Sequence, residues 1–217
     1  TAAAARTASC ASGGDAMIPG TVALRAVIFD LDGTLVDSQL DFAAMRAELG
    51  APADVGLLEY IDGLPSAAAR HSAMTVVHRH ELAGAAAATW MPGAEAALHS
   101  LHRQGLRTAI VTRNSREAAR LTMARLRMPR MPLMAREDAA PKPDPEALLA
   151  LASRWALPPA HCAYVGDFRY DIEAAQRAGM VPVLYAPNGA APPAMAGDSH
   201  RLADFQALVA WAAKLAP

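Results

Sequence analysis

The sequence predicts an α/β fold, with a doubly wound parallel sheet and a small helical cap inserted after the first strand. Three observations lead to this prediction. Short apolar runs alternate with Ala- and Leu-rich helical patterns, polar residues follow the ends of several of these runs, and a long segment without strand pattern interrupts the alternation. At 217 residues and 53% hydrophobic composition, the chain can bury one substantial core and a small accessory domain.

The alternation itself defines the expected elements. We expect strands at 22–31, 107–112, 162–167 and 181–185, and a weaker strand at 132–135. We expect helices at 94–103, 115–127, 145–155 and 170–178, with Pro145 in a first turn and with Gly105 and Gly179 just past helix ends. Such alternation indicates a Rossmann-like parallel sheet with helices on both faces, and functional side chains then gather at the carboxyl ends of the strands.

The interruption spans residues 40–91 and reads as three or four helices, including a long one from Ser66 to about Ala87. Pro92 and Gly93 close it. We therefore divide the chain into a flexible leader (1–20), a core (21–39 and 92–217) and a helical cap (40–91). Translation is expected to start naturally at Met17, within the leader. The cap follows the first strand directly, so it would cover whatever that strand's carboxyl end binds.

Composition excludes several classes of protein. A net charge of −1 provides no basic surface for nucleic acid or an anionic membrane, and no segment is long and apolar enough to span a bilayer. Cys10 lies in the leader and Cys162 in an expected strand, which gives neither a disulfide framework nor metal-ligand spacing. We therefore expect a cytoplasmic protein, either a monomer or a homodimer, without nucleic-acid or membrane partners.

Asp30 and Asp32 stand where the first strand ends, in the sequence Val-Ile-Phe-Asp-Leu-Asp-Gly-Thr. Gly33 marks the turn that follows. An ionised aspartate at a buried strand end costs several kcal/mol unless a cation or hydrogen bonds compensate it. A bound divalent metal ion would explain why two carboxylates occur here.

Three further segments along the chain contain polar or charged residues of the kinds that bind ligands. They are Thr112-Arg113-Asn114, Lys142 within Ala-Pro-Lys-Pro-Asp-Pro, and the run from Gly166 to Asp171 that contains Asp167. Carboxylate oxygens suit a hard cation such as Mg²⁺, whereas a hydroxyl and a lysine suit the anion that this cation attracts. A phosphoryl group fits that combination.

These four segments, in this order, resemble the haloacid dehalogenase superfamily of phosphohydrolases. The resemblance covers 22–217 and is strongest to members with a small helical cap, such as phosphoglycolate phosphatases and β-phosphoglucomutases. It implies a Mg²⁺-dependent phosphatase that acts on a small phosphorylated metabolite, such as a sugar phosphate or phosphoglycolate, through an aspartyl-phosphate intermediate.

The resemblance also implies roles for the aspartate pair. Asp30 would be the nucleophile and a metal ligand. Asp32 would be the general acid and base, and would reach the metal only through its backbone carbonyl. The chemistry is consistent, because a carboxylate attacking an anionic phosphate needs nearby positive charge, and a second carboxyl group can protonate the leaving oxygen.

By the same resemblance, Thr112 and Lys142 would bind the phosphate and Asp167 the metal. Asp171 would touch the metal or orient its waters. Phe168 is a departure, because many relatives carry a small hydroxyl residue at this position.

Weaker signals surround this set. Arg113 and Asn114 are candidate substrate-binding residues because they follow Thr112, although Asn114 could instead start a helix. The cap carries polar residues that could contact the substrate, although we expect them to form a solvated helix face: Arg46, Arg70, His71, His78, Arg79, His80 and Glu81. A zinc site at His78 and His80 is not expected, because side chains two residues apart on a helix point in different directions.

Related activities can be compared with these residues. Dehalogenases of the superfamily that this chain resembles lack the second aspartate, so Asp32 argues against carbon–halogen cleavage. Phosphonoacetaldehyde hydrolases of the same superfamily form a Schiff base with a cap lysine, and the expected cap contains no lysine, which argues against that activity. A β-phosphoglucomutase-like phosphotransferase uses the same core residues and stays open as an alternative. A catalytically silent binding module is disfavoured by the complete acidic, threonine and lysine set.

Overall fold

A six-stranded, entirely parallel sheet forms the centre of the molecule in the computed structural model, which describes residues 23–187 and 199–216. Its strands run in the order β5-β4-β1-β6-β7-β8. They are β1 (Ala26–Phe29), β4 (Arg107–Val111), β5 (Leu133–Met134), β6 (Cys162–Gly166), β7 (Val181–Tyr185) and β8 (His200–Leu202). The predicted fold class is confirmed, and all five expected strands are present, β7 with the expected bounds and the other four with shorter ones.

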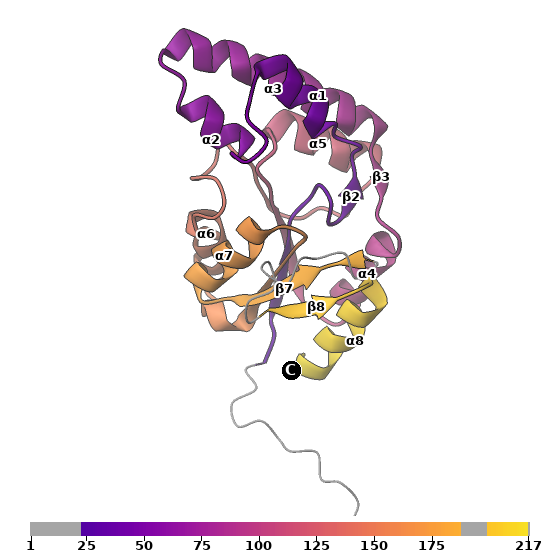
Figure 1. The fold of residues 1–217 in the computed structure, drawn as a ribbon. Helices are drawn as coiled ribbons and strands as arrows, with labels where there is room; N and C mark the ends of the chain where they lie inside the picture. Colours follow the sequence, from indigo (N-terminus) through magenta and orange to yellow (C-terminus); the bar gives the residue numbers. More distant parts are fainter. Residues whose placement is uncertain (1–22, 188–198, 217) are drawn as a thin grey trace, which may run out of the picture.

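Helices cover both faces of this sheet, as Figure 1 shows. On one face α4 (Ala94–Arg103), α5 (Arg116–Arg125) and α8 (Phe205–Leu215) contribute to the larger apolar core. On the other face lie α6 (Glu146–Arg154) and α7 (Arg169–Ala178). Successive β1 residues point to opposite faces, so Phe29 packs in the first core and Ile28 in the second. This two-sided burial explains why β1 is apolar throughout.

The register of the central strands brings their ends level. Phe29 of β1 pairs with Ile110 of β4 on one side and with Val165 of β6 on the other. The chain therefore leaves β1, β4 and β6 at the same edge of the sheet, and the residues that follow each strand become neighbours.

Three helices lie at that end of the molecule: α1 (Phe42–Leu49), α2 (Leu57–Asp62) and α3 (Ala67–Ala87). We call them the helical layer. They share a small apolar cluster of their own, made by Met45, Leu57, Ile61, Ala73 and Val77. The long helix agrees with the expected one, and Ser66 caps it by accepting a hydrogen bond from the Ala69 amide. The division of the chain into core and cap stays a prediction.

Some elements were not expected. The strands β2 (Val36–Asp37) and β3 (Thr89–Trp90) pair antiparallel where the chain enters and leaves the helical layer. Two residues are too few to show an alternating pattern. Strand β8 is also short and mostly exposed, so it has no apolar run, while α8 does carry a start signal in its N-cap Asp204. The predicted leader (1–20), Met17 included, lies outside the described residues.

None of the helices in residues 23–187 and 199–216 combines the length and apolar character needed to cross a membrane.

Candidate active site

One pocket lies between the carboxyl ends of the strands and the helical layer, with a cavity volume of about 570 Å³. Residues from both regions line it. All the site residues predicted from the sequence are among them: Asp30, Asp32, Thr112, Arg113, Asn114, Lys142, Asp167 and Asp171. Their roles stay predictions, but the structure brings the whole set to one place.

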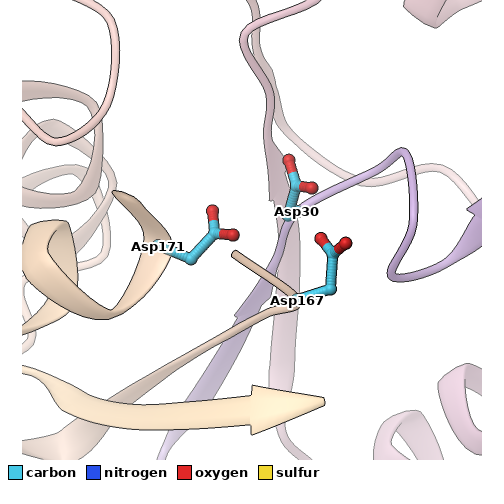
Figure 2. A group of neighbouring side chains, drawn as sticks. All are labelled: Asp30, Asp167 and Asp171. Carbon is cyan, nitrogen blue, oxygen red and sulfur yellow. The ribbon is translucent and has the colours of Figure 1, made fainter. Parts of the chain in front are cut away.

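Three carboxylates meet at the floor of this pocket (Figure 2). Asp30 follows β1, Asp167 follows β6 and Asp171 lies in the first turn of α7. One oxygen from each lies within 4.8 Å of the others. Three oxygen donors at this spacing fit a hard divalent cation, which would compensate their mutual repulsion.

Burial raises the pKa of two of these acids, Asp30 and Asp167. For Asp167, burial together with the negative charge of Asp171 raises the pKa to about 6, and the Thr34 hydroxyl donates a hydrogen bond to Asp167 Oδ1 at 3.2 Å. For Asp30, burial raises the pKa well above its ordinary value, although Lys142 opposes the shift. Without added positive charge, Asp30 and Asp167 therefore hold protons more readily than isolated carboxylates do.

Lys142 supplies positive charge from the protein itself. Its Nζ donates to Asp30 Oδ1 and to Asp171 Oδ1, each at 2.6 Å, and the side chain is buried. Burial alone would lower the pKa of Lys142, but the two carboxylates outweigh it and hold the pKa above its ordinary value. The lysine is thus a fixed cation beside the predicted nucleophile.

Asp171 is held by several donors. Its Oδ2 accepts from the Phe168 backbone amide at 3.0 Å, which caps the start of α7. Its Oδ1 lies 3.1 Å from the Tyr164 hydroxyl in addition to its contact with Lys142. A Cβ on Gly166 would come within 2.2 Å of Asp171 Cγ, so this carboxylate packs directly on the strand end. Asp171 therefore fixes Lys142 as well as contributing to the acidic cluster.

Asp32 lies close by in a different environment. Asn114 Nδ2 donates to Asp32 Oδ2 at 3.0 Å, while Oδ1 is buried and finds no hydrogen-bond partner within the described part of the chain. Burial raises the pKa of Asp32, and interactions with Ser38 and Asn114 offset part of the rise. A carboxyl group with a raised pKa and one free oxygen can give and take a proton, as the predicted acid and base role requires.

The turn that follows Asp32 requires glycine. Gly33 has φ +82°, and a Cβ there would lie 2.4 Å from Asp167 Oδ2. Both the backbone conformation and the close approach exclude a side chain. The missing side chain at Gly33 lets the Asp167 carboxylate pack directly against this turn.

Thr112 and Arg113 occupy the loop after β4. Thr112 Oγ1 accepts from the Asn114 amide at 3.0 Å, which leaves the hydroxyl hydrogen available to a bound anion. Arg113 extends toward the helical layer, where its Nη2 lies 2.6 Å from Glu59 Oε1 of α2. Its guanidinium also lies over the Tyr170 ring at 4.8 Å from the centroid.

One polar residue of the helical layer does not match the expected solvated face. Glu81 of α3 is buried, and Arg136 Nη1 donates to its Oε1 at 2.6 Å. The Ser115 amide donates to Glu81 Oε2 at 3.2 Å. The expectation was wrong for Glu81 because this face of α3 meets the core, where Arg136 compensates the charge. A signal was present, since Glu81 continues the i, i+4 stripe of Ala73 and Val77.

Comparison with known proteins identifies the family. Residues 24–179 match the family described as "Hydrolase: haloacid dehalogenase-like hydrolase". The chain belongs to this family. The resemblance inferred from the four segments, and the prediction of a hydrolytic enzyme, are confirmed.

The chain is similar to a plasmid phosphoglycolate phosphatase of Cupriavidus necator, with 34% identity over 88% of this chain and 95% of the relative. Another is a haloacid dehalogenase-like hydrolase domain-containing protein of Arabidopsis thaliana, 31% identical over 76% of this chain and 72% of the relative. Among solved structures, a hydrolase from Pseudomonas syringae aligns with a TM-score of 0.73 at 23% identity, over 89% of this chain and all of that one. This structural likeness supports the fold.

Proposed function

We propose that this haloacid dehalogenase-like hydrolase is a Mg²⁺-dependent phosphatase that acts on a small phosphomonoester through an aspartyl-phosphate intermediate. The observation that carries the proposal is the contact of Lys142 with Asp30, beside Asp32 and Asp167, in one pocket. Relatives named phosphoglycolate phosphatase support phosphate ester hydrolysis. The substrate classes that the sequence predicts, sugar phosphates and phosphoglycolate, are the first to test.

Mg²⁺ would be held by the carboxylates of Asp30 and Asp167 and by the backbone carbonyl of Asp32. The oxygen-only donor set and the repulsion among the clustered carboxylates fit this ion. When bound, it would neutralise charge on the substrate phosphate and on the attacking carboxylate. Lys142 and Thr112 would hold the remaining phosphate oxygens.

The first step is attack of Asp30 on phosphorus. A bond forms between an Asp30 oxygen and phosphorus while the bond from phosphorus to the leaving oxygen breaks. Asp32 donates its proton to that oxygen, so the product leaves as a neutral alcohol. Lys142, already 2.6 Å from Asp30, stabilises the charge that develops on the phosphoryl group.

The second step is hydrolysis of the aspartyl-phosphate. Asp32, now ionised, takes a proton from a water molecule as that water attacks phosphorus. The bond between Asp30 and phosphorus breaks, inorganic phosphate leaves, and both carboxyl groups return to their starting states. Asn114 holds the orientation of Asp32 through both steps.

A substrate panel tests this proposal. The purified chain is assayed with sugar phosphates and phosphoglycolate, with Mg²⁺ and with excess EDTA, and free phosphate is measured. Release of phosphate only with Mg²⁺ is expected. No turnover of any phosphomonoester would contradict the proposal, and isomerised sugar phosphate without free phosphate would identify the mutase alternative instead.

Replacing Asp167 with asparagine is expected to weaken Mg²⁺ binding at least about tenfold. The variant removes one oxygen charge from the proposed site. In wild type, affinity for Mg²⁺ is expected to fall as the pH drops through about 6, because the Asp167 carboxyl then takes up a proton that competes with the metal. Calorimetric titration with Mg²⁺ between pH 5.5 and 8 measures both effects.

The same substitution has a second expected outcome, in protein without metal. Because folding raises the pKa of Asp167, its charge destabilises the native state above about pH 6, and this penalty disappears as the pH falls toward the unfolded pKa. Asp167→Asn should therefore melt at a higher temperature than wild type at pH 8 and lose this advantage in acid. Asp62→Asn, at the exposed end of α2, serves as the control and should change neither property. Unaltered Mg²⁺ affinity in Asp167→Asn would contradict the metal role.

A further inference from the structure

Phe168 has no role in the reaction just described. It follows the proposed metal ligand Asp167 directly, and its side chain lines the pocket with 46% of its surface exposed. Its ring makes an edge contact with Tyr170, at 5.2 Å between centroids. A large apolar ring left open to solvent beside a reacting centre is available to contact a ligand.

The helical layer and the segments that join it also contribute exposed apolar side chains to the pocket lining. Phe42 in the first turn of α1 is 56% exposed, and Val55, before α2, is 37% exposed. Five large apolar side chains are exposed within residues 23–187 and 199–216, and three of them, Phe42, Val55 and Phe168, line this one pocket. Exposed apolar surface is therefore concentrated where the part of the substrate beyond the phosphate would lie.

Positive groups in the pocket are mostly engaged with the protein itself. Arg113 lies 2.6 Å from Glu59, and Arg136 lies 2.6 Å from Glu81. Arg46 Nη1 donates to two backbone carbonyls, at 2.5 and 2.8 Å. At Arg46, Arg113 or Arg136, a second anionic group on the substrate, such as a carboxylate, would have to displace one of these contacts. Arg169, which also lines the pocket, donates to the Tyr170 hydroxyl at 3.1 Å and lies 6.0 Å from the centroid of the Phe168 ring.

We propose, on the basis of the phosphatase function above, that the preferred substrate is a phosphomonoester of an alcohol with an apolar, aromatic body. The phosphate lies among Asp30, Thr112 and Lys142. The aromatic body lies between Phe168 and the wall that contains Phe42. The exposed rings of Phe168 and Phe42 in the pocket lining favour a flat aromatic group over a hydrated sugar or a two-carbon acid.

Benzyl phosphate, ethyl phosphate and phosphoglycolate test this assignment. All three are esters of alkyl alcohols, so the first two differ mainly in the ring and the third adds a carboxylate. With Mg²⁺, wild type is expected to show a kcat/KM for benzyl phosphate about tenfold or more above that for the other two. Phe168→Ser and, separately, Phe42→Ser should reduce the ratio of benzyl to ethyl phosphate about tenfold, chiefly through KM.

Two further variants act as controls. Phe168→Tyr keeps a ring and should keep the preference. Leu149→Ser, an exposed apolar residue of α6 outside the pocket, should leave the ratio unchanged. Turnover of ethyl phosphate or phosphoglycolate without preference for benzyl phosphate would overturn this inference alone, as would an equal effect of Phe168→Ser on both esters. No turnover of any of the three would overturn this inference, and the proposed function would be overturned as well only if the sugar phosphates of the panel were not hydrolysed either.

Discussion

Replacement of Asp30 by asparagine is expected to lower kcat at least about a thousandfold, because an amide cannot form the aspartyl-phosphate. The substitution keeps the shape of the side chain, so the loss reports chemistry more than packing. Steady-state kinetics at saturating Mg²⁺ measure it. The decrease should appear in kcat for every phosphomonoester that wild type hydrolyses, regardless of its leaving group.

Direct detection of the intermediate makes this test sharper. Wild type quenched with acid during turnover should carry phosphate attached to the protein, and Asp30→Asn should carry none. The control Asp62→Asn should match wild type in both assays, since Asp62 is exposed at the end of α2. Activity of Asp30→Asn within tenfold of wild type would show that Asp30 is not the nucleophile.

Replacement of Lys142 by methionine is expected to impair both activity and folding. Asp30 and Asp171 each lie 2.6 Å from the ammonium group, and both are buried. Breaking a buried ion pair by removing one partner typically costs about 3–5 kcal/mol. Chemical denaturation of the metal-free protein at pH 8 measures this loss, and activity should fall below detection.

The pH dependence of that loss has a definite sign. Without the lysine, burial keeps the pKa of Asp30 raised, and the destabilisation is present when the carboxyl groups are ionised. The stability gap between Lys142→Met and wild type should therefore narrow as the pH falls from 8 to 5.5. Lys142→Arg keeps the charge and should recover part of the stability. An equal gap at both pH values would contradict this electrostatic explanation.

Lys214 provides a matched control, because it is the only other lysine in the sequence. It lies exposed in the last turn of α8. Lys214→Met should change the free energy of unfolding by no more than about 0.5 kcal/mol and leave activity unchanged. The comparison of Lys142→Met with Lys214→Met separates the effect of losing the lysine at the pocket from the general effect of losing one positive charge.

The sequence alone predicts the sheet, most of its helices and the residues that meet at its edge. Each of these follows from a local pattern. Ala26 to Phe29 are apolar because both faces of β1 are buried, and a parallel sheet necessarily places Asp30, Thr112 and Asp167 at one edge. The family match then confirms the resemblance that these residues predicted.

Other features depend on contacts between distant segments, which no local pattern records. Glu81 meets Arg136 across 55 positions, and Lys142 meets Asp30 across 112. The paired strands β2 and β3 are too short to be recognised before the chain brings them together.

The sequence determines the aspartate pair and the glycine that follows it, since a buried strand end and a tight turn admit few alternatives. The surroundings of the pair were decided only by tertiary structure. Folding places Lys142 between two carboxylates, Asn114 against Asp32 and Phe168 at the open side of the pocket. The physical reason is that charge compensation and exposure depend on which distant side chains become neighbours, whereas periodicity depends only on the chain itself.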